Sequence, residues 1–285
     1  MMGSRHLVLS DIHENGESLI RLLNLAESSR TGFTDIWLLG DLFGHADQSR
    51  KIDKFDHSFL NALKILFEYP VAAVRGNWEY WLAHPEMDES NENQRPHRTE
   101  LEERRSALAT EVPDLLERIE KNEVLCPENS DNQFTLFHGC SYSCHDSRTY
   151  HAAPCESYLN PKDLNIVTRG LFENEENLAT AHFLFGHTHL PGYFVYSTTT
   201  FINLWRPFRG EMTEQVTDFG NAVQRFGINP GSAGVSDGTT PCTALILDTE
   251  NRTFSYLVNT DSTVSNRRKA IFSANSILNT GLTEE

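Results

Sequence analysis

The sequence has no long apolar run, and that absence excludes several classes of protein. No window approaches the roughly 18 uninterrupted apolar residues that a membrane-spanning helix needs, so we expect no membrane contact. A strand-like run already begins at about Leu7, which leaves no room for a signal peptide of roughly 15–30 residues. We therefore expect a cytoplasmic protein.

Cysteine is also scarce. The chain has five cysteines, and an odd number in a cytosolic protein argues against a disulfide framework. Cys140, Cys144 and Cys155 lie near His145 and His151, but they lack the paired C-x2-C spacing of common structural zinc sites. We favour free thiols over a small zinc site.

Positive charge is in deficit, with 24 Lys and Arg against 40 Asp and Glu and a net charge of -16. An acidic field repels polyanions, so we expect no stable nucleic-acid complex. Acidity does not exclude phosphate substrates, because bound divalent ions reverse the field at their own site. The 39% hydrophobic content suffices for a core, and we expect one domain over residues 1–285.

The first part of the chain alternates strand-like runs with helical stripes. Apolar residues at helical spacing within 17–26 and 55–67 predict two helices between three strands. This β-α-β-α-β order predicts a parallel sheet with right-handed crossovers. Beyond about residue 133 the pattern turns β-rich, and Thr243–Leu247 and Thr253–Val258 are predicted to be the closing strands.

A different pattern occupies residues 81–126. Its first part is a polar loop, and Leu101–Ile119 is predicted to be helical, with Pro113 suited to a first turn. We interpret this stretch as a helical insertion over the sheet edge, with a cap on the site and a surface excursion as equal alternatives. From about residue 260 the chain is a polar tail, expected to be partly disordered.

Five short polar islands each follow an apolar, strand-like run. Loops that leave the carboxyl ends of neighbouring strands converge on one edge of an α/β sheet, where ligands bind. Each island alone is a weak signal, but five in this order predict a metal centre. The islands are Asp11-Ile12-His13, Gly40-Asp41, Gly76-Asn77, His138-Gly139 and Gly186-His187-Thr188-His189.

The series resembles the calcineurin-like metallophosphoesterase superfamily, whose pattern runs D-x-H, G-D, G-N-H-D/E, a histidine after a strand, and G-H-x-H. The resemblance covers roughly residues 7–258, and Asn229-Pro230-Gly231-Ser232 resembles a segment of its small prokaryotic phosphodiesterase branch. It implies an α/β (α+β) fold, a four-layer αββα sandwich of two mixed sheets, here with a helical insertion.

The resemblance also implies two divalent metal ions. It assigns Asp11, His13 and His189 to one ion and Asn77, His138 and His187 to the other, with Asp41 bridging them. Carboxylate and imidazole ligands suit manganese, iron, zinc or nickel better than calcium. Hydrolysis of P–O bonds would then proceed by attack of a metal-bridging hydroxide, with Asp41 and Asn77 among the catalytic residues.

One position departs from the family pattern, because Trp78 replaces the histidine of G-N-H-D/E. That histidine is thought to protonate the leaving group in many members, and tryptophan cannot. His45 is a candidate replacement acid, although a surface histidine is the more frequent case. Arg75 is a candidate phosphate contact or an ion-pair residue, and Trp78 a candidate stacking surface or a core residue.

The favoured function is a dinuclear metal-dependent phosphodiesterase. Its substrate would be a phosphorylated small molecule, a nucleotide or a phosphoprotein. A Ser/Thr protein phosphatase and a dinucleoside-polyphosphate hydrolase are the enzymatic alternatives. A non-catalytic binding module on the same fold is the alternative outside the enzymes, and the intact set of seven metal-ligand positions argues against it.

Overall fold

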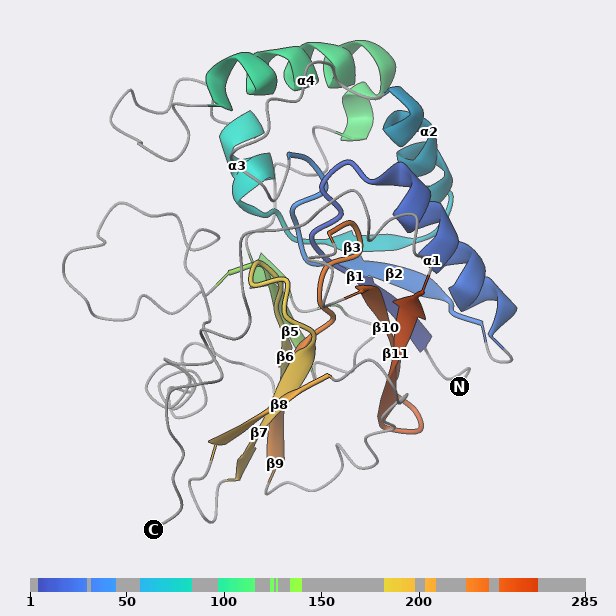
Figure 1. Cartoon of the computed structure of the whole chain (residues 1–285), viewed down its shortest axis with the longest axis vertical. Helices are drawn as coiled ribbons and strands as arrows, with labels where there is room; N and C mark the ends of the chain where they lie inside the picture. The colour runs from blue at the N-terminus through green and yellow to red at the C-terminus, as the bar shows by residue number, and fades with distance from the viewer. Residues whose placement is uncertain are drawn as a thin grey trace, which may run out of the picture.

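Two β-sheets packed face to face form the centre of the molecule (Figure 1). The structure is a computed structural model. It describes residues 5–29, 32–44, 57–83, 97–115, 124–125, 127, 134–139, 182–197, 203–208, 224–235 and 241–260.

The first sheet has five strands in the order β11-β10-β1-β2-β3. Strands β1, β2 and β3 are parallel, as the alternating pattern predicts, and β10 and β11 join antiparallel beside β1. In chain order these five strands span Arg5–Leu9, Asp35–Leu38, Val71–Ala73, Cys242–Asp248 and Thr253–Asn259. The crossover helices α1 and α2 span Gly16–Ser28 and His57–Leu66.

Helix α1 shows how the sequence produces these elements. Asn15 caps the helix, because its side chain accepts a hydrogen bond from the Ser18 backbone N–H at 3.0 Å. The apolar stripe at helical spacing is buried against the first sheet: Leu19, Leu22, Leu23 and Ala26.

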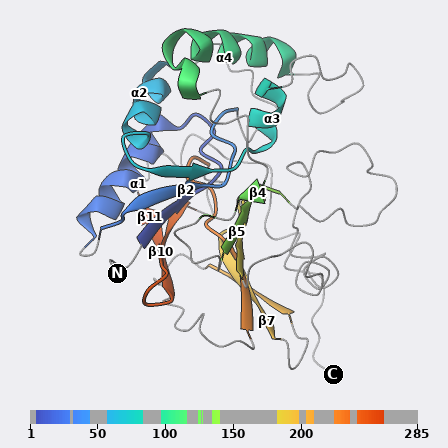
Figure 2. The ribbon, with the colours of Figure 1, turned by 180° about the vertical axis from the view of Figure 1, so that it is seen from behind.

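The second sheet has six strands among the described residues, in the order β4-β5-β6-β9-β7-β8. Its centre is parallel, and β4, β7 and β8 are added antiparallel. In chain order the strands span Val124–Leu125, Phe134–Phe137, His182–Leu184, Gly192–Ser197, Asn203–Pro207 and Gln224–Asn229. Figure 2 shows this sheet from behind, with α1 and α2 on the far side of the first sheet.

Alternation along β1 divides the core into two layers. Leu7 and Leu9 face the helices, whereas Val8 faces the second sheet and packs in one cluster with Phe134 and Leu184. The predicted α/β class with two packed mixed sheets is therefore confirmed. Among the described residues, helices cover the outer face of the first sheet only.

Part of the region predicted as an insertion is helical. Helix α4 spans Arg98–Glu111 and packs on the short helix α3, Asn77–Ala83, above the first sheet (Figure 1). The sequence predicts helical structure over 101–119 with Pro113 in a first turn; α4 ends at Glu111, and residues 113–115 start a new helical turn at the proline. Residues 84–96 and the tail from 261 lie outside the described ranges. No helix of the described chain is long and apolar enough to cross a membrane.

The loops after β1, β2 and β3 touch one another directly. Backbone N–H groups of Asp11, Ile12 and Glu14 donate to carbonyls of the loop that follows β2. Gly40 lies at the closest approach: its φ is +90°, and a Cβ there would lie 2.4 Å from the Gly76 nitrogen. Only glycine satisfies both the backbone angle and the contact.

Substitution of this glycine tests that contact. We expect Gly40→Ala to lower the free energy of unfolding by about 1–3 kcal/mol more than Gly32→Ala does, because alanine at position 40 overpacks the junction. Gly32 is a matched control, since its φ is +57° but a Cβ there would meet no described atom within 4 Å. Equal losses in chemical denaturation would show that backbone strain alone matters at position 40.

Candidate metal centre

Six of the predicted ligands form two groups at the carboxyl ends of the strands. In each group one ligand atom per residue lies within 4.8 Å of the others. The groups are Asp11, His13 and His189, and Asp41, His138 and His187. They come from the loops after β1, β2, β5 and β6, so strands of both sheets contribute.

Asp41 belongs to the second group and also faces the first. Its Oδ2 atom is 3.3 Å from His138 Nε2 and 4.0 Å from His13 Nε2, so one oxygen faces both sets of ligands. The other oxygen, Oδ1, accepts a hydrogen bond from the Trp78 backbone N–H at 3.1 Å. This arrangement is what a bridging carboxylate requires.

Asp11 is held in the same manner. Its Oδ2 accepts hydrogen bonds from Ser10 Oγ at 2.5 Å and from the His187 backbone N–H at 3.0 Å. Its Oδ1 is buried and lies 3.2 Å from His189 Nε2. One oxygen is therefore anchored by the protein, and the other is directed at the imidazoles of its group.

Backbone carbonyls orient two of the imidazoles. His138 Nδ1 donates to the Leu39 carbonyl at 2.6 Å, and His13 Nδ1 pairs with the Phe43 carbonyl at 3.2 Å. A carbonyl accepts only, so Nδ1 carries the hydrogen and Nε2 presents its lone pair to the centre. His13 Nε2 lies 3.0 Å from His189 Nε2, and two ring nitrogens this close need a proton or a cation between them.

Asn77 offers a further oxygen. It is the first residue of α3, is buried, and its Oδ1 has no hydrogen-bond partner among the described residues. A buried amide oxygen without a partner is costly, and a cation would compensate for that cost.

The backbone of the centre is strained. Five of the seven predicted ligands have positive φ, between 48° and 65°: Asp11, His13, Asp41, His187 and His189. Each such conformation costs on the order of 1–3 kcal/mol outside glycine and persists only where its surroundings enforce it. Asp11 and His13, and likewise His187 and His189, are two residues apart and follow the end of a strand; the left-handed turns bring each of them to the centre. The turn after Leu9 brings Asp11 and His13 into one group, the grouping that the family resemblance implies.

Two supports of the centre were not assigned from sequence. Asn229 donates from Nδ2 to the Gly186 carbonyl at 3.1 Å and to Thr188 Oγ1 at 2.9 Å. Ser232 Oγ donates to the Asp11 carbonyl at 2.7 Å. The Asn229-Pro230-Gly231-Ser232 segment therefore braces two of the ligand loops, and its turn signal was the available clue.

Glu79 is the third unassigned support. Its carboxylate is buried and accepts hydrogen bonds from four backbone N–H groups: those of Asp41, Leu42, Phe43 and Gly76. Burial and the nearby Asp41 carboxylate raise the pKa of Glu79 to about 7, against the opposing effect of these donors. Glu79 occupies the last position of the G-N-H-D/E pattern, and it joins the loops after β2 and β3.

The charges of the centre balance around its imidazoles. Burial alone would raise the pKa values of Asp11 and Asp41, but the surrounding histidines outweigh burial and lower both. Burial opposes a charge on His138, yet Asp41 and its other partners raise the pKa of His138 to about 9. Burial and the adjacent His138 lower the pKa of His187 to about 3. Ionised carboxylates, imidazoles that can present a ring nitrogen once His138 loses its proton, and the unpartnered amide oxygen of Asn77 fit a pair of divalent transition-metal ions.

The predicted residues other than the metal ligands are Trp78, Arg75 and His45. Trp78 is 4% exposed and packs on Trp81 and His97, with ring centroids 5.2 and 4.9 Å away, which fits the core-packing alternative. The Arg75 guanidinium carbon lies 4.9 Å from the centroid of the Tyr80 ring. His45 and the cysteine cluster at 140–155 lie outside the described residues.

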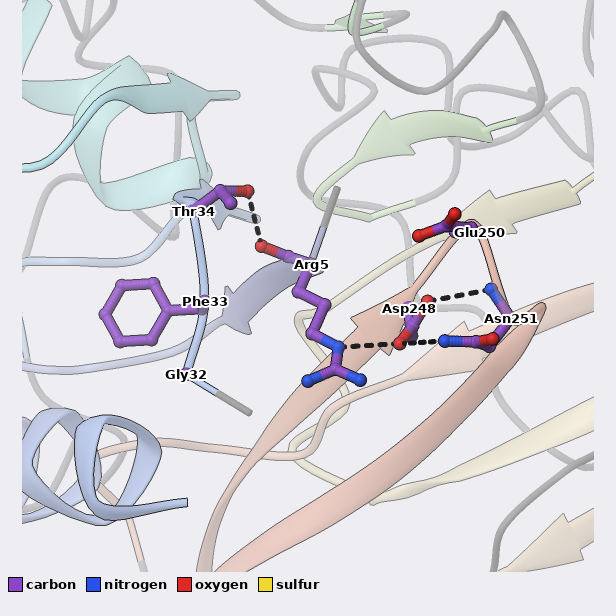
Figure 3. Close-up of a pocket in the computed structure, with 7 residues that line it drawn as sticks. All are labelled: Arg5, Gly32, Phe33, Thr34, Asp248, Glu250 and Asn251. Atoms are coloured by element: carbon purple, nitrogen blue, oxygen red, sulfur yellow. Dashed lines mark hydrogen bonds and ion pairs between the residues drawn. The ribbon is translucent and has the colours of Figure 1, made fainter. Parts of the chain in front are cut away.

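A cavity of about 240 Å³ lies away from this centre, at the start of β1 (Figure 3). Arg5 is the first residue of β1, whereas Asp11 lies two residues beyond its last residue, Leu9. In the cavity wall Asp248 accepts hydrogen bonds from Arg5 and Asn251, which brace the turn between β10 and β11. This cavity is separate from the predicted ligands.

Metal uptake should depend on pH. The raised pKa of His138 stabilises the metal-free fold. This contribution is complete below pH 6.5, the ordinary pKa of histidine, and it is lost as the pH rises through about 9. His138 must lose its proton to bind a cation, so apparent affinity should rise by up to about tenfold per pH unit between pH 7 and 9. Calorimetric Mn²⁺ titrations in buffers of different ionisation enthalpy measure the released proton. Affinity unchanged over this range would contradict the protonated state of His138.

The chain is similar to known proteins in sequence and in fold. A family model described as the calcineurin-like phosphoesterase superfamily domain matches residues 5–252. A metallophosphoesterase from Sphaerobacter thermophilus has a similar fold, with a TM-score of 0.59 and 19% identity over 93% of this chain and 92% of that chain. Yfce, a phosphoesterase from E. coli, matches with a TM-score of 0.39 and 17% identity over 89% of this chain and 98% of its own.

No curated protein shows significant sequence similarity to the chain. The family model nevertheless spans most of the sequence and includes all five polar islands. The chain therefore belongs to the calcineurin-like phosphoesterase superfamily, and it is a phosphoester hydrolase.

Proposed function

We propose that the protein is a phosphodiesterase that works with two divalent cations. In this proposal Asp11, His13 and His189 hold one cation, and Asn77, His138 and His187 hold the other. The observation that carries the two-cation centre is the position of Asp41 Oδ2, which faces both ligand groups. When bound, two such cations activate water and neutralise the charge that develops on the phosphate.

The protein's own contribution is to fix the ligands before substrate arrives. Carbonyl-anchored imidazoles cannot rotate away from the centre, and anchored carboxylates present one oxygen each. Arg75 directly precedes the Gly76-Asn77 island, and its guanidinium is suited to a phosphate oxygen of the substrate. The ring of Tyr80 supports that guanidinium from one face.

Trp78 supports a diesterase with good leaving groups. Its indole N–H is not an acid at neutral pH, and the ring is buried rather than directed at solvent. An enzyme without an acid at this position favours leaving groups that depart as stable anions, such as aryl oxides. His45, four residues after Asp41 in the sequence, is the alternative proton donor that the sequence offers.

The central role of Asp41 is testable with a matched variant. We expect Asp41→Asn to lower Mn²⁺-dependent hydrolysis of bis-p-nitrophenyl phosphate by more than about 100-fold. Loss of a residue that only supports a metal ligand costs up to about 100-fold in activity, and loss of a ligand should cost more. Asp248→Asn also removes one carboxylate charge, but at the other end of the sheet, and should retain activity. Full activity of Asp41→Asn would refute the proposed centre.

The leaving group provides a second test. Because no acid is available at position 78, the rate should fall by about tenfold or more when p-nitrophenolate is replaced by an alkoxide leaving group of the same diester. The measurement is kcat for a series of methyl aryl and dialkyl phosphates at saturating Mn²⁺. Similar rates across the series would show that another residue donates the proton.

Faster turnover of p-nitrophenyl phosphate or of a phosphopeptide than of any diester would assign the enzyme to the phosphatases instead.

A further inference from the structure

A buried ion pair joins the insertion helix to a ligand loop. Arg104 of α4 donates to the Glu14 carboxylate through both Nε and Nη2, the latter at 3.0 Å from Oε2. The two side chains are 1% and 6% exposed. Glu14 directly follows His13, a proposed ligand of the first cation, so this contact ends one residue from the centre.

Glu14 also holds two ligand loops together. Its Oε1 accepts a hydrogen bond from the Gly44 backbone N–H at 2.9 Å, and its own N–H donates to the Leu42 carbonyl at 2.9 Å. Its φ is +57°, next to +48° at His13. The carboxylate therefore fixes a strained turn that carries a ligand, and it fixes that turn to the loop that carries Asp41.

The helix provides a rigid base for the arginine. Arg104 Nη1 donates to the Glu100 carbonyl at 3.1 Å, one turn earlier in α4. Leu101 and Leu108, three residues before Arg104 and four after it, are buried in the first core layer. The guanidinium is thus held by the core and by its own helix, and two of its N–H groups point at one carboxylate, a geometry with little freedom.

Stability alone does not explain such a pair. Desolvation of two buried charges offsets much of their attraction, and well-packed apolar side chains often stabilise a fold as well. The pair instead fixes the orientation of the Glu14 side chain, because two N–H groups of Arg104 hold its carboxylate.

We propose that Arg104 is a positioning residue for the metal centre. Through Glu14 it holds the His13 turn in the left-handed conformation that places His13 beside Asp11 and His189. The insertion is then a buttress for the first cation site. This inference rests on the proposed two-cation function.

Four proteins test it: the wild type, Arg104→Met, Glu14→Gln combined with Arg104→Met, and Arg98→Met. Arg98 lies on the same helix and pairs with Glu102, but its side chain is 69% exposed. Arg104→Met leaves the Glu14 charge buried without its partner, whereas the double variant removes that charge and keeps an acceptor for Gly44. The readouts are Mn²⁺ affinity by calorimetry, the visible spectrum of bound Co²⁺, and thermal unfolding in chelator.

We expect Arg104→Met to weaken one of the two cation affinities by about 10–100-fold, and Arg98→Met to change neither. In the double variant thermal stability should recover while the weakened affinity and the altered Co²⁺ spectrum persist. Affinity that recovers together with stability would reduce Arg104 to a structural role and overturn the inference. A wild-type protein that binds fewer than two cations would instead refute the proposed function, so the two failures are distinguishable.

Discussion

Two aspartates buried side by side among four histidines are the constraint on which the structure depends. Asp11 and Asp41 are almost fully removed from water, and buried carboxylates are unfavourable unless positive charge lies close by. Without a metal, a proton on His138 supplies part of that charge. In the proposed two-cation centre, divalent cations would supply more of it and would also bind the amide oxygen of Asn77, which has no hydrogen-bond partner among the described residues.

The fold supports this centre with contacts from distant parts of the chain. A left-handed residue costs on the order of 1–3 kcal/mol, so two or three of them use much of a typical net stability of about 5–15 kcal/mol. Each strained turn is accordingly held by side chains from elsewhere. Ser232 holds the Asp11 carbonyl, Glu79 holds the loop of Asp41, and Asn229 holds the loop between His187 and His189.

The sequence predicted the parts of the molecule that follow local rules. Apolar runs marked the strands, helical spacing marked α1 and α2, and the polar residue after each strand end marked the centre, because parallel strands bring their carboxyl ends together. The supports follow no local rule. Arg104 and Glu14 are 90 residues apart, and an arginine on the buried stripe between Leu101 and Leu108 looks like an interruption of that stripe. Glu79 stands at the D/E position of the family pattern, but nothing in the sequence shows that its carboxylate accepts hydrogen bonds from four backbone N–H groups.

Trp78 shows that a replaced family residue changes packing as well as chemistry. The indole ring lies against Gly44, where a Cβ would be 2.0 Å from the ring and φ is +76°. Gly44 is also the residue whose N–H binds Glu14. Trp78 is part of α3 and also contacts His97, at the start of α4. It therefore links both helices to the loop that carries Asp41. A position that is histidine in the family pattern is here a packing residue between the helices and the loop of Asp41. Because the same substitution removes an acid and adds rigidity, catalysis in this protein should depend more on how firmly the cations are held than on proton transfer from the protein.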